Sequence, residues 1–443
     1  MVKGSKAIAC AGVVACALGG CTLITDSFLT NEFSGDPFPI HVETSSGAIV
    51  LGVRTAGTAD RVAVLDLLSP FTVTDPGPEP PPSVSYVDIT LLGKPGPTDP
   101  LGALDLSTAL PRARFTDAQV ISMHPCNMQS PTCNVGPAGT RPFTSIVGAD
   151  VLAGDAVRLR LGDNLIFVLP DVGGKDRGRT LSCEAVFDSP YRGGGTIVFP
   201  STELPFGNRR ITLQACLGPD PDPKQPQSQR GADALLVVST SIGISILGEA
   251  AYERYRNAHV DPVTNTKPPE LATLLSDTVY LPSGLVPGRR ANIDALALVA
   301  TSTSNALAPC RQVYAHHLLA ERSCISTDDC PCEDGKSFCA VPAMLELTPP
   351  SGVDVLVVPD TEPTLQALRT ELRPDQPEVD GLLGTDVLRA AEIDVDYPHD
   401  RLIARCPRGT CSARPQLAQA EDRCQLNRCI HGIEEAAKLG VCD

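Results

Sequence analysis

Several residue types and motifs are scarce in this sequence or missing from it. It has no Trp, and aromatic residues make up only 4% of the chain. It also has no G-x-S-x-G elbow, H-E-x-x-H helix, phosphate-binding loop or dinucleotide fingerprint, which argues against the enzyme classes built on those motifs. The seven His are scattered except for His316 and His317, which would point to opposite faces of a strand. We therefore predict no metal and no cofactor.

Positive charge is also in short supply. Lys and Arg together number 36 against 52 Asp and Glu, giving a formal net charge of -16. A surface with this balance repels nucleic acid phosphates and anionic lipid headgroups. We therefore predict no nucleic acid partner.

The N-terminus has the layout of a secretory leader. Lys3 and Lys6 precede an apolar run at 7–18 that is too short to span a bilayer, and small residues follow it. Leu18-Gly19-Gly20-Cys21 resembles the bacterial lipobox. This resemblance implies cleavage before Cys21 and lipid attachment there, and more than one acyl chain gives a lasting membrane anchor. Thr22 follows where an inner-membrane retention signal would have Asp, which favours the outer membrane. The alternative is an ordinary secretory leader with a chance cysteine.

The remaining composition favours a disulfide-containing β protein. Of the 17 Cys, Cys10 and Cys16 leave with the leader and Cys21 takes lipid, so an even number remains. In an exported chain this predicts disulfides. The 41 Pro and 37 Gly indicate many turns between short strands.

Short apolar runs at 39–44, 48–55 and 61–68 predict strands joined by turns. Proline-rich segments at 75–82, 93–100 and 218–231 predict loops. Helical patterns are few, and they lie at 248–257, at 365–372 and from Pro415 onward.

An internal repeat gives the strongest information about architecture. Residues 63–73 match 236–246, each an apolar strand followed by a small polar turn and a second strand. Residues 146–152 match 382–388 and share Gly, Asp, Val and Leu in register, and each copy is followed by a strand containing Leu-Ile. Two copies of one unit predict two related lobes.

The repeated blocks resemble the pepsin-like aspartic proteases. In that family each lobe has an apolar-apolar-Asp-Thr/Ser-Gly turn and a later apolar-apolar-Gly segment behind it. The resemblance implies a mainly β, bilobal pepsin-like double-β-barrel architecture. The wider separation of the two blocks in lobe 2 predicts a cysteine-rich insertion there, and the cysteines after Cys406 predict a small disulfide-rich helical C-terminal tail. The expected parts are a signal peptide at 1–20, a polar tether at 21–37, lobe 1 at 38–204, lobe 2 at 205–406 with the insertion around 305–345, and the cysteine-rich tail at 407–443.

The catalytic positions depart from the family pattern. Peptide hydrolysis of this type needs two carboxylates that share one proton. Asp66 stands at the first position, but Leu67 and Leu68 replace the hydroxyl residue and the glycine that follow it in the family. In lobe 2 Thr240 keeps the hydroxyl, whereas Ser239 stands where the second Asp belongs. Because serine does not ionise near neutral pH, these positions cannot form the shared-proton pair.

Asp66 has three interpretations: a lone base, a carboxylate that binds a ligand, or a residue kept for the hydrogen bonds of its turn. We favour the third. Asp60, Asp75 and Asp233 are candidates for a substitute second carboxylate, without a spacing argument for any of them.

We therefore predict a cell-envelope lipoprotein with an inactive aspartic-protease-like body that binds a peptide or protein or serves as a structural surface protein. The alternative is an active aspartic endopeptidase that uses Asp66 with an unidentified second carboxylate.

The cysteine-rich stretch at 324–339 is predicted to be a disulfide-stapled loop. Cys330 and Cys332 lie too close together for the usual paired zinc spacing. Calcium binding by Asp328, Asp329 and Asp334 is an alternative, although the EF-hand spacing is absent.

Overall fold

The computed structural model describes about half of the chain, including nearly all of the repeated blocks. The described residues are 32–33, 38–42, 47–55, 60–74, 83–93, 111–122, 145–169, 185–188, 194–199, 202–207, 210–218, 231–260, 266–281, 284–299, 310, 318–323, 336–341, 344–347, 352–371, 378–399, 401–405 and 412–414. Cys21, Asp75, the residues 324–335 and the tail after 414 lie outside them, so the predictions made for those residues stay predictions.

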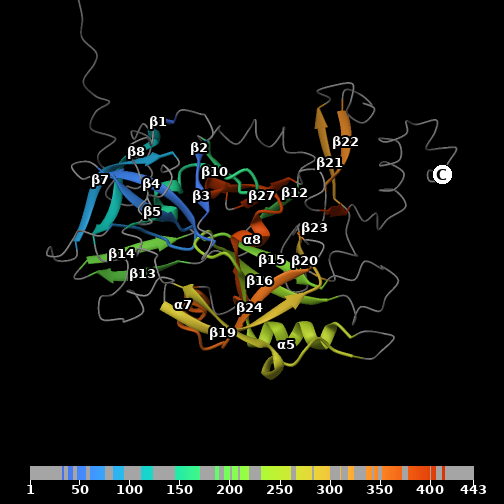
Figure 1. Cartoon of the computed structure of the whole chain (residues 1–443). Coiled ribbons are helices and arrows are strands. Elements are labelled where there is room, and N and C mark those ends of the chain that lie inside the picture. The colour runs from blue at the N-terminus through green and yellow to red at the C-terminus, as the bar shows by residue number, and fades with distance from the viewer. Residues whose placement is uncertain are drawn as a thin grey trace, which may run out of the picture.

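Lobe 1 is built on a closed ring of strands (Figure 1). Its members are β4 (Ile49–Thr55), β5 (Arg61–Leu65), β6 (Thr72–Thr74), β7 (Ser83–Leu92), β8 (Pro111–Ser122) and β9 (Ser145–Val147). Pairing runs from β4 to β5, β9, β6, β8 and β7, and β7 pairs with β4 again. The short strands β1 (Glu32–Phe33) and β3 (His41–Val42) add to β8 and β4. A ring of this kind leaves few free strand edges.

Lobe 2 repeats the same ring. Its strands are β15 (Thr212–Leu217), β16 (Ala232–Val238), β17 (Ser245–Gly248), β19 (Gly284–Ile293), β20 (Leu296–Val299), β24 (Val353–Val358) and β25 (Gly381–Leu383). They pair in the order β15, β16, β25, β17, β24 and β19, and β20, which follows β19 after a two-residue break, pairs back to β15. Parallel and antiparallel pairings match lobe 1 one by one. The repeat predicted from sequence is confirmed.

A third sheet joins the lobes. It runs β12 (Ala185–Asp188), β27 (Arg401–Arg405), β26 (Glu392–Asp396), β10 (Ala156–Arg160), β11 (Leu165–Leu169) and β2 (Phe38–Pro39). The β10–β11 hairpin follows the lobe 1 ring and the β26–β27 hairpin follows the lobe 2 ring, and β10 pairs with β26. The mainly β, two-lobed architecture is therefore confirmed.

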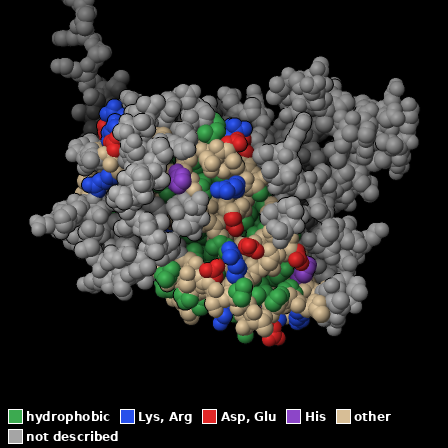
Figure 2. Space-filling view, viewed as in Figure 1, with side chains coloured by type: hydrophobic (Ala, Val, Ile, Leu, Met, Phe, Trp, Pro, Cys, Tyr) green, Lys and Arg blue, Asp and Glu red, His purple; other side chains and the backbone are tan. Residues whose placement is uncertain are grey.

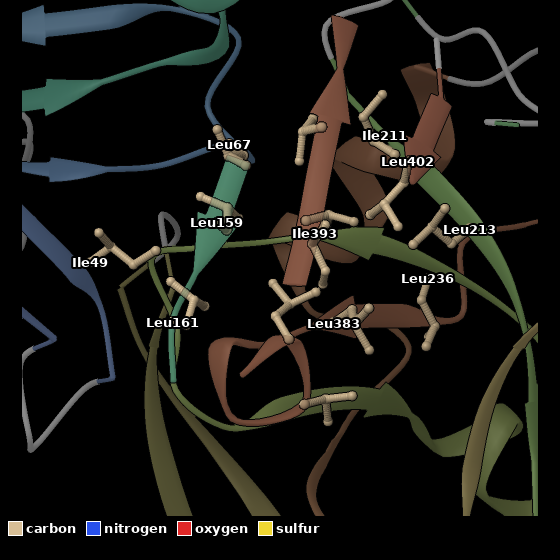
Figure 3. Close-up of a cluster of buried hydrophobic side chains, with 14 of the residues drawn as sticks. Ile49, Leu67, Leu159, Leu161, Ile211, Leu213, Leu236, Leu383, Ile393 and Leu402 are labelled. Carbon is tan, nitrogen blue, oxygen red and sulfur yellow. The ribbon is translucent and has the colours of Figure 1, made fainter. Parts of the chain in front are cut away.

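The main apolar core extends across both lobes. Figure 3 shows Leu159 and Leu161 of lobe 1 with Leu236 and Leu383 of lobe 2 in one cluster of buried side chains. In β4 almost every residue is buried, because both faces of this strand meet apolar layers, so it reads as a continuous apolar run instead of an alternating one.

The helices lie outside the rings. They are α3 (Ala149–Leu152), α5 (Glu249–Ala258), α7 (Pro363–Glu371) and α8 (Thr385–Leu388), with single turns η3 (Leu271–Thr273) and η4 (Tyr397–His399). Helices α3 and α8 occupy equivalent places after β9 and β25, and α5 and α7 confirm the two helices predicted at 248–257 and 365–372.

Lobe 2 is longer than lobe 1 at two places. Only eight residues separate the end of β6 from the start of β7, whereas α5, η3 and β18 (Leu275–Leu281) stand between β17 and β19. The second place contains β21 (Leu318–Ser323), β22 (Lys336–Val341) and β23 (Met344–Glu346), between β20 and β24. The sequence predicted a single insertion around 305–345, because the repeated blocks mark only where the extra chain begins and ends.

The remaining described elements are the hairpin of β13 (Gly194–Phe199) and β14 (Thr202–Gly207), and β28 (Ser412–Arg414), which pairs with β23. A disulfide joins Cys216 on β15 to Cys310, so the segment that contains Cys310 is tied covalently to the lobe 2 ring.

Candidate functional site

Two equivalent turns meet between the lobes. One follows β5 and contains Asp66, and the other follows β16 and contains Ser239. The Asp66 amide donates to the Val147 carbonyl at 2.9 Å, and the Ser239 amide donates to the Leu383 carbonyl at 3.0 Å. The two residues therefore occupy equivalent positions, as the sequence repeat predicts.

The second repeated block, 146–152 in lobe 1 and 382–388 in lobe 2, supports each turn through the same hydrogen bonds. In lobe 1 the Thr72 hydroxyl donates to Asp150 at 2.7 Å and accepts from the Gly148 amide at 3.0 Å. In lobe 2 the Ser245 hydroxyl donates to Asp386 at 3.2 Å and accepts from the Gly384 amide at 2.9 Å. The aspartates of the second repeated block thus have a structural function. Each carboxylate also accepts a hydrogen bond from the backbone amide of the next residue, Val151 in lobe 1 and Val387 in lobe 2.

Thr240 ties the lobe 2 turn to lobe 1. Its hydroxyl donates to the Leu65 carbonyl at 2.7 Å and accepts from the Leu67 amide at 3.0 Å. Its carbonyl accepts from the Ile49 amide at 2.9 Å. Since Leu67 has no hydroxyl, it cannot return this interaction toward lobe 2.

The two leucines after Asp66 are packed side chains. Leu67 lies in the main core that both lobes share (Figure 3). Leu68 is 1% exposed and belongs to a separate cluster whose other members all come from lobe 2, among them Val279, Val286 and Leu365. Burial of a leucine side chain stabilises a fold by about 2 kcal/mol. The turn of lobe 1 is therefore anchored in the apolar interior of lobe 2.

The two lobes also meet through glycine backbone. Gly47 has φ +70°, and a Cβ at this position would lie 2.1 Å from the Cα of Gly243. The Thr385 hydroxyl donates to the Gly47 carbonyl at 2.7 Å beside this contact. A side chain at Gly47 would force the main chains apart.

A buried ion pair that sequence reasoning missed covers the lobe 1 turn. Arg210, just before β15, donates to the Leu68 carbonyl and forms an ion pair of 2.6 Å with Glu371 at the end of α7. Both side chains are less than one fifth exposed. No local pattern marks either residue, because the interaction joins segments far apart in the sequence.

Asp66 itself is 3% exposed. Burial raises the pKa of its carboxyl group, and hydrogen bonds from the Leu68 amide and the Ser241 hydroxyl, together with the Arg210 charge, act in the opposite direction. The Leu68 amide lies 2.9 Å from Oδ1. The largest influences on this pKa are burial, the Leu68 and Ser69 amides, the Ser241 hydroxyl and the Arg210 charge.

Hydroxyl groups stand where the second carboxylate would be expected. Ser239 is fully buried, and its Oγ lies 3.1 Å from the Oγ of Ser241. In lobe 2 two neighbouring serine hydroxyls therefore stand in this turn. Serine hydroxyls cannot share an acidic proton with Asp66 in the way that a second carboxyl group can.

The proposed substitutes for the second carboxylate are engaged elsewhere where they are described. Asp60 pairs with Arg54 at 2.6 Å, and Asp233 accepts from the Cys310 amide at 2.7 Å. Asp75 lies outside the described residues.

Within the described part of the chain, no group of three or more His, Cys, Asp or Glu is arranged to hold a metal ion. In that same part, every helix is too short or too polar to cross a membrane. Figure 2 shows acidic and basic side chains interspersed over the described part of one face.

Comparison with solved structures finds aspartic-proteinase-like chains at low identity. The crystal structure of the aspartic proteinase from Irpex lacteus is 12% identical, with a TM-score of 0.33, over 85% of this chain and 98% of that one. Basic 7S globulin from soybean is 11% identical, with a TM-score of 0.34, over 83% of this chain and 94% of that one. No family model matches the sequence, and no curated protein matches it.

Proposed function

We propose that this chain is an exported envelope lipoprotein, anchored through Cys21 to the outer membrane, whose aspartic-protease-like body binds a peptide or protein partner and no longer hydrolyses peptides by the two-carboxylate mechanism. The observation that supports the loss of this mechanism is that the fully buried Ser239, at the position equivalent to Asp66, offers a hydroxyl in place of a second carboxylate.

Three contacts support this proposal. The Leu68 side chain fills lobe 2 interior, Arg210 covers the Leu68 carbonyl, and Thr240 bonds to the Leu65 carbonyl. A catalytic carboxylate has to reach its substrate or a bound water. Contacts that hold this turn from the lobe 2 side favour a structural role for it.

The proposal predicts no acid-dependent peptide cleavage. The purified full chain would be incubated with a diverse peptide mixture from pH 3 to 8, beside the Asp66→Asn variant, and products would be identified by mass spectrometry. We expect the same products, or none, from both proteins. Cleavage that disappears in Asp66→Asn would support the alternative, an active endopeptidase with a second carboxylate outside the described residues.

A further inference from the structure

Strand β18 forms an outer edge of lobe 2. It is the end strand of the described ten-stranded sheet, and in the described structure it pairs on one side only, with β19. The strands added outside the lobe 1 ring, β1 and β3, have two residues each, whereas β18 has seven. Lobe 2 therefore presents a much longer strand edge at this place.

This strand is fixed on its inner face and open to solvent elsewhere. Val279 and Leu281 are buried in an apolar cluster of lobe 2. Leu275 is 77% exposed, and Ser276 and Thr278 are exposed as well. Figure 2 shows hydrophobic side chains at the lower rim of the described face, around the place of β19 in Figure 1. An open strand edge on a rigid support is a template for the addition of another strand.

The direction of the backbone groups follows from the register. Thr278 lies opposite Pro287, which has no amide hydrogen, and the Thr278 amide donates to Asp277 Oδ1 at 2.8 Å. In an antiparallel pair, residues that bond to the partner strand alternate with residues that do not. The amides and carbonyls of Ser276, Thr278 and Tyr280 therefore point to the open edge.

The charge at this edge is negative and loosely paired. The Asp277 side chain is 42% exposed, and the Arg290 guanidinium lies 3.8 Å from it, beyond hydrogen-bond distance. Arg290 also faces Asp354 at 4.0 Å. Gly288, directly opposite Asp277 on β19, brings no side chain to it, and a Cβ there would lie 2.7 Å from Leu356 Cγ. The Asp277 carboxylate therefore lacks a close cation within the described structure.

We propose that β18 binds an extended segment of a partner protein, which adds to the open edge as a further strand and places a basic side chain against Asp277. This inference rests on the proposed binding function and names its surface and the chemistry of the partner. The partner backbone exchanges hydrogen bonds with Ser276 and Tyr280. It also bonds to Thr278, whose amide is released when Asp277 turns to the incoming cation.

Charge favours a foreign partner over a second copy of this chain. Antiparallel pairing of two β18 strands about Thr278 would place Asp277 of each copy opposite Val279 of the other. The two Asp277 carboxylates would then be diagonal neighbours on one face of the sheet, where like charges repel. The formal net charge of -16 adds a general repulsion between copies.

The test uses a synthetic peptide of about eight residues that alternates Val and Thr and carries one central Lys. Hydrogen exchange of the full chain, followed by mass spectrometry, would be measured with and without this peptide. We expect the peptide to slow exchange in 275–281 and not in β7, which is paired on both sides. The same peptide with every backbone amide N-methylated cannot donate to the edge and should give no protection.

Thr278→Pro and Thr278→Ala are the matched variants. Proline removes the outward amide without removing a hydrogen bond to β19, whereas alanine keeps that amide. We expect Thr278→Pro to weaken peptide binding, measured by fluorescence polarisation, about tenfold, and Thr278→Ala to bind like the wild type. Thermal unfolding would verify that each variant is folded.

Asp277→Lys tests the charge with every backbone amide in place, so it serves also if Thr278→Pro does not fold. This variant should bind the Lys peptide more weakly than the wild type does, and it should prefer a matched peptide with a central Glu. Equal binding of both peptides by both proteins would contradict the role of Asp277.

Absence of protection in 275–281, or equal protection by the N-methylated peptide, would overturn the inference and leave the proposed binding function to another surface. A wild-type dimer in analytical ultracentrifugation that Thr278→Pro abolishes would also overturn it, because a second copy would then occupy the edge. Acid-dependent peptide cleavage lost in Asp66→Asn would instead overturn the proposed function.

Discussion

At the scale of single residues, Asp66 is a carboxyl group in a buried turn, where opposing effects act on its pKa. The burial that raises its pKa favours the neutral acid, and the amide and hydroxyl around it partly oppose this effect. The isosteric Asn keeps an oxygen for the Leu68 amide. The Asp66→Asn variant therefore removes the charge of this side chain and keeps its shape.

We expect the wild type to lose stability relative to Asp66→Asn as the pH rises. In the unfolded chain Asp ionises near pH 4. Because the folded-state pKa is higher, the unfolded state loses its proton first. The unfolding free energy of the wild type therefore falls, relative to that of the variant, until the pH passes the folded-state pKa. Urea denaturation of both proteins from pH 3 to 8 would measure this difference.

Asp60→Asn is the control with the opposite sign. The Arg54 hydrogen bond lowers the pKa of Asp60, so the wild type should gain stability relative to this variant as the pH rises through that range. If both differences change in the same direction with pH, the inference that burial raises the pKa of Asp66 is wrong.

Sequence reasoning placed Asp66 and Ser239 correctly as equivalent residues because their turns lie inside repeated blocks. It missed Arg210 and Glu371. These two residues meet across 161 residues of chain, so no local pattern could mark either of them.

At the scale of elements, the contact between β10 and β26 holds the lobes together. Arg158 on β10 forms a two-point interaction with Asp394 on β26, at 2.6 and 2.9 Å. The Asp394 side chain is only 4% exposed, whereas Arg158 is 28% exposed. Loss of Arg158 would therefore leave a buried charge without its main partner.

We expect Arg158→Met to lower the free energy of unfolding by about 3 kcal/mol, because breaking a buried pair strands the remaining charge. Arg54→Met, which breaks an ion pair whose Arg is 46% exposed, should cost far less, because solvent screens that pair. Denaturant unfolding of the two variants beside the wild type would measure both values. Equal losses would show that burial of Asp394 does not matter.

The short strands and two helices were predictable because their apolar patterns are local. The two separate stretches of extra chain in lobe 2 were not predictable in this way. In the first of them, the sequence of β18 looks like a mixed polar segment. It becomes a strand by pairing along its whole length with β19. Pairing between neighbouring segments of this kind decides structure more strongly than strand propensity does.

At the scale of the whole molecule, the sequence alone predicts where the protein resides. The lipobox resemblance at 18–21 predicts that the mature chain starts at a lipid-modified Cys21. This leader lies outside the described residues.

We expect an alkyne fatty acid fed to expressing bacteria to label the wild type and not Cys21→Ser, and the variant to leave the membrane fraction. Click chemistry followed by gel fluorescence would detect the label. Cys16→Ser is the control, because this cysteine lies within the predicted leader and its loss should leave labelling unchanged. Persistent labelling of Cys21→Ser would contradict the anchor.

The contact between Gly47 and Gly243 has a consequence for the history of such a chain. A Cβ on Gly47 would collide with the main chain of the other half, so the gap between the halves is set by the thickness of two peptide backbones. Codon 47 therefore cannot drift from glycine while the halves stay joined. In any lineage that keeps this fold, the glycine at position 47 would be among the last residues to change.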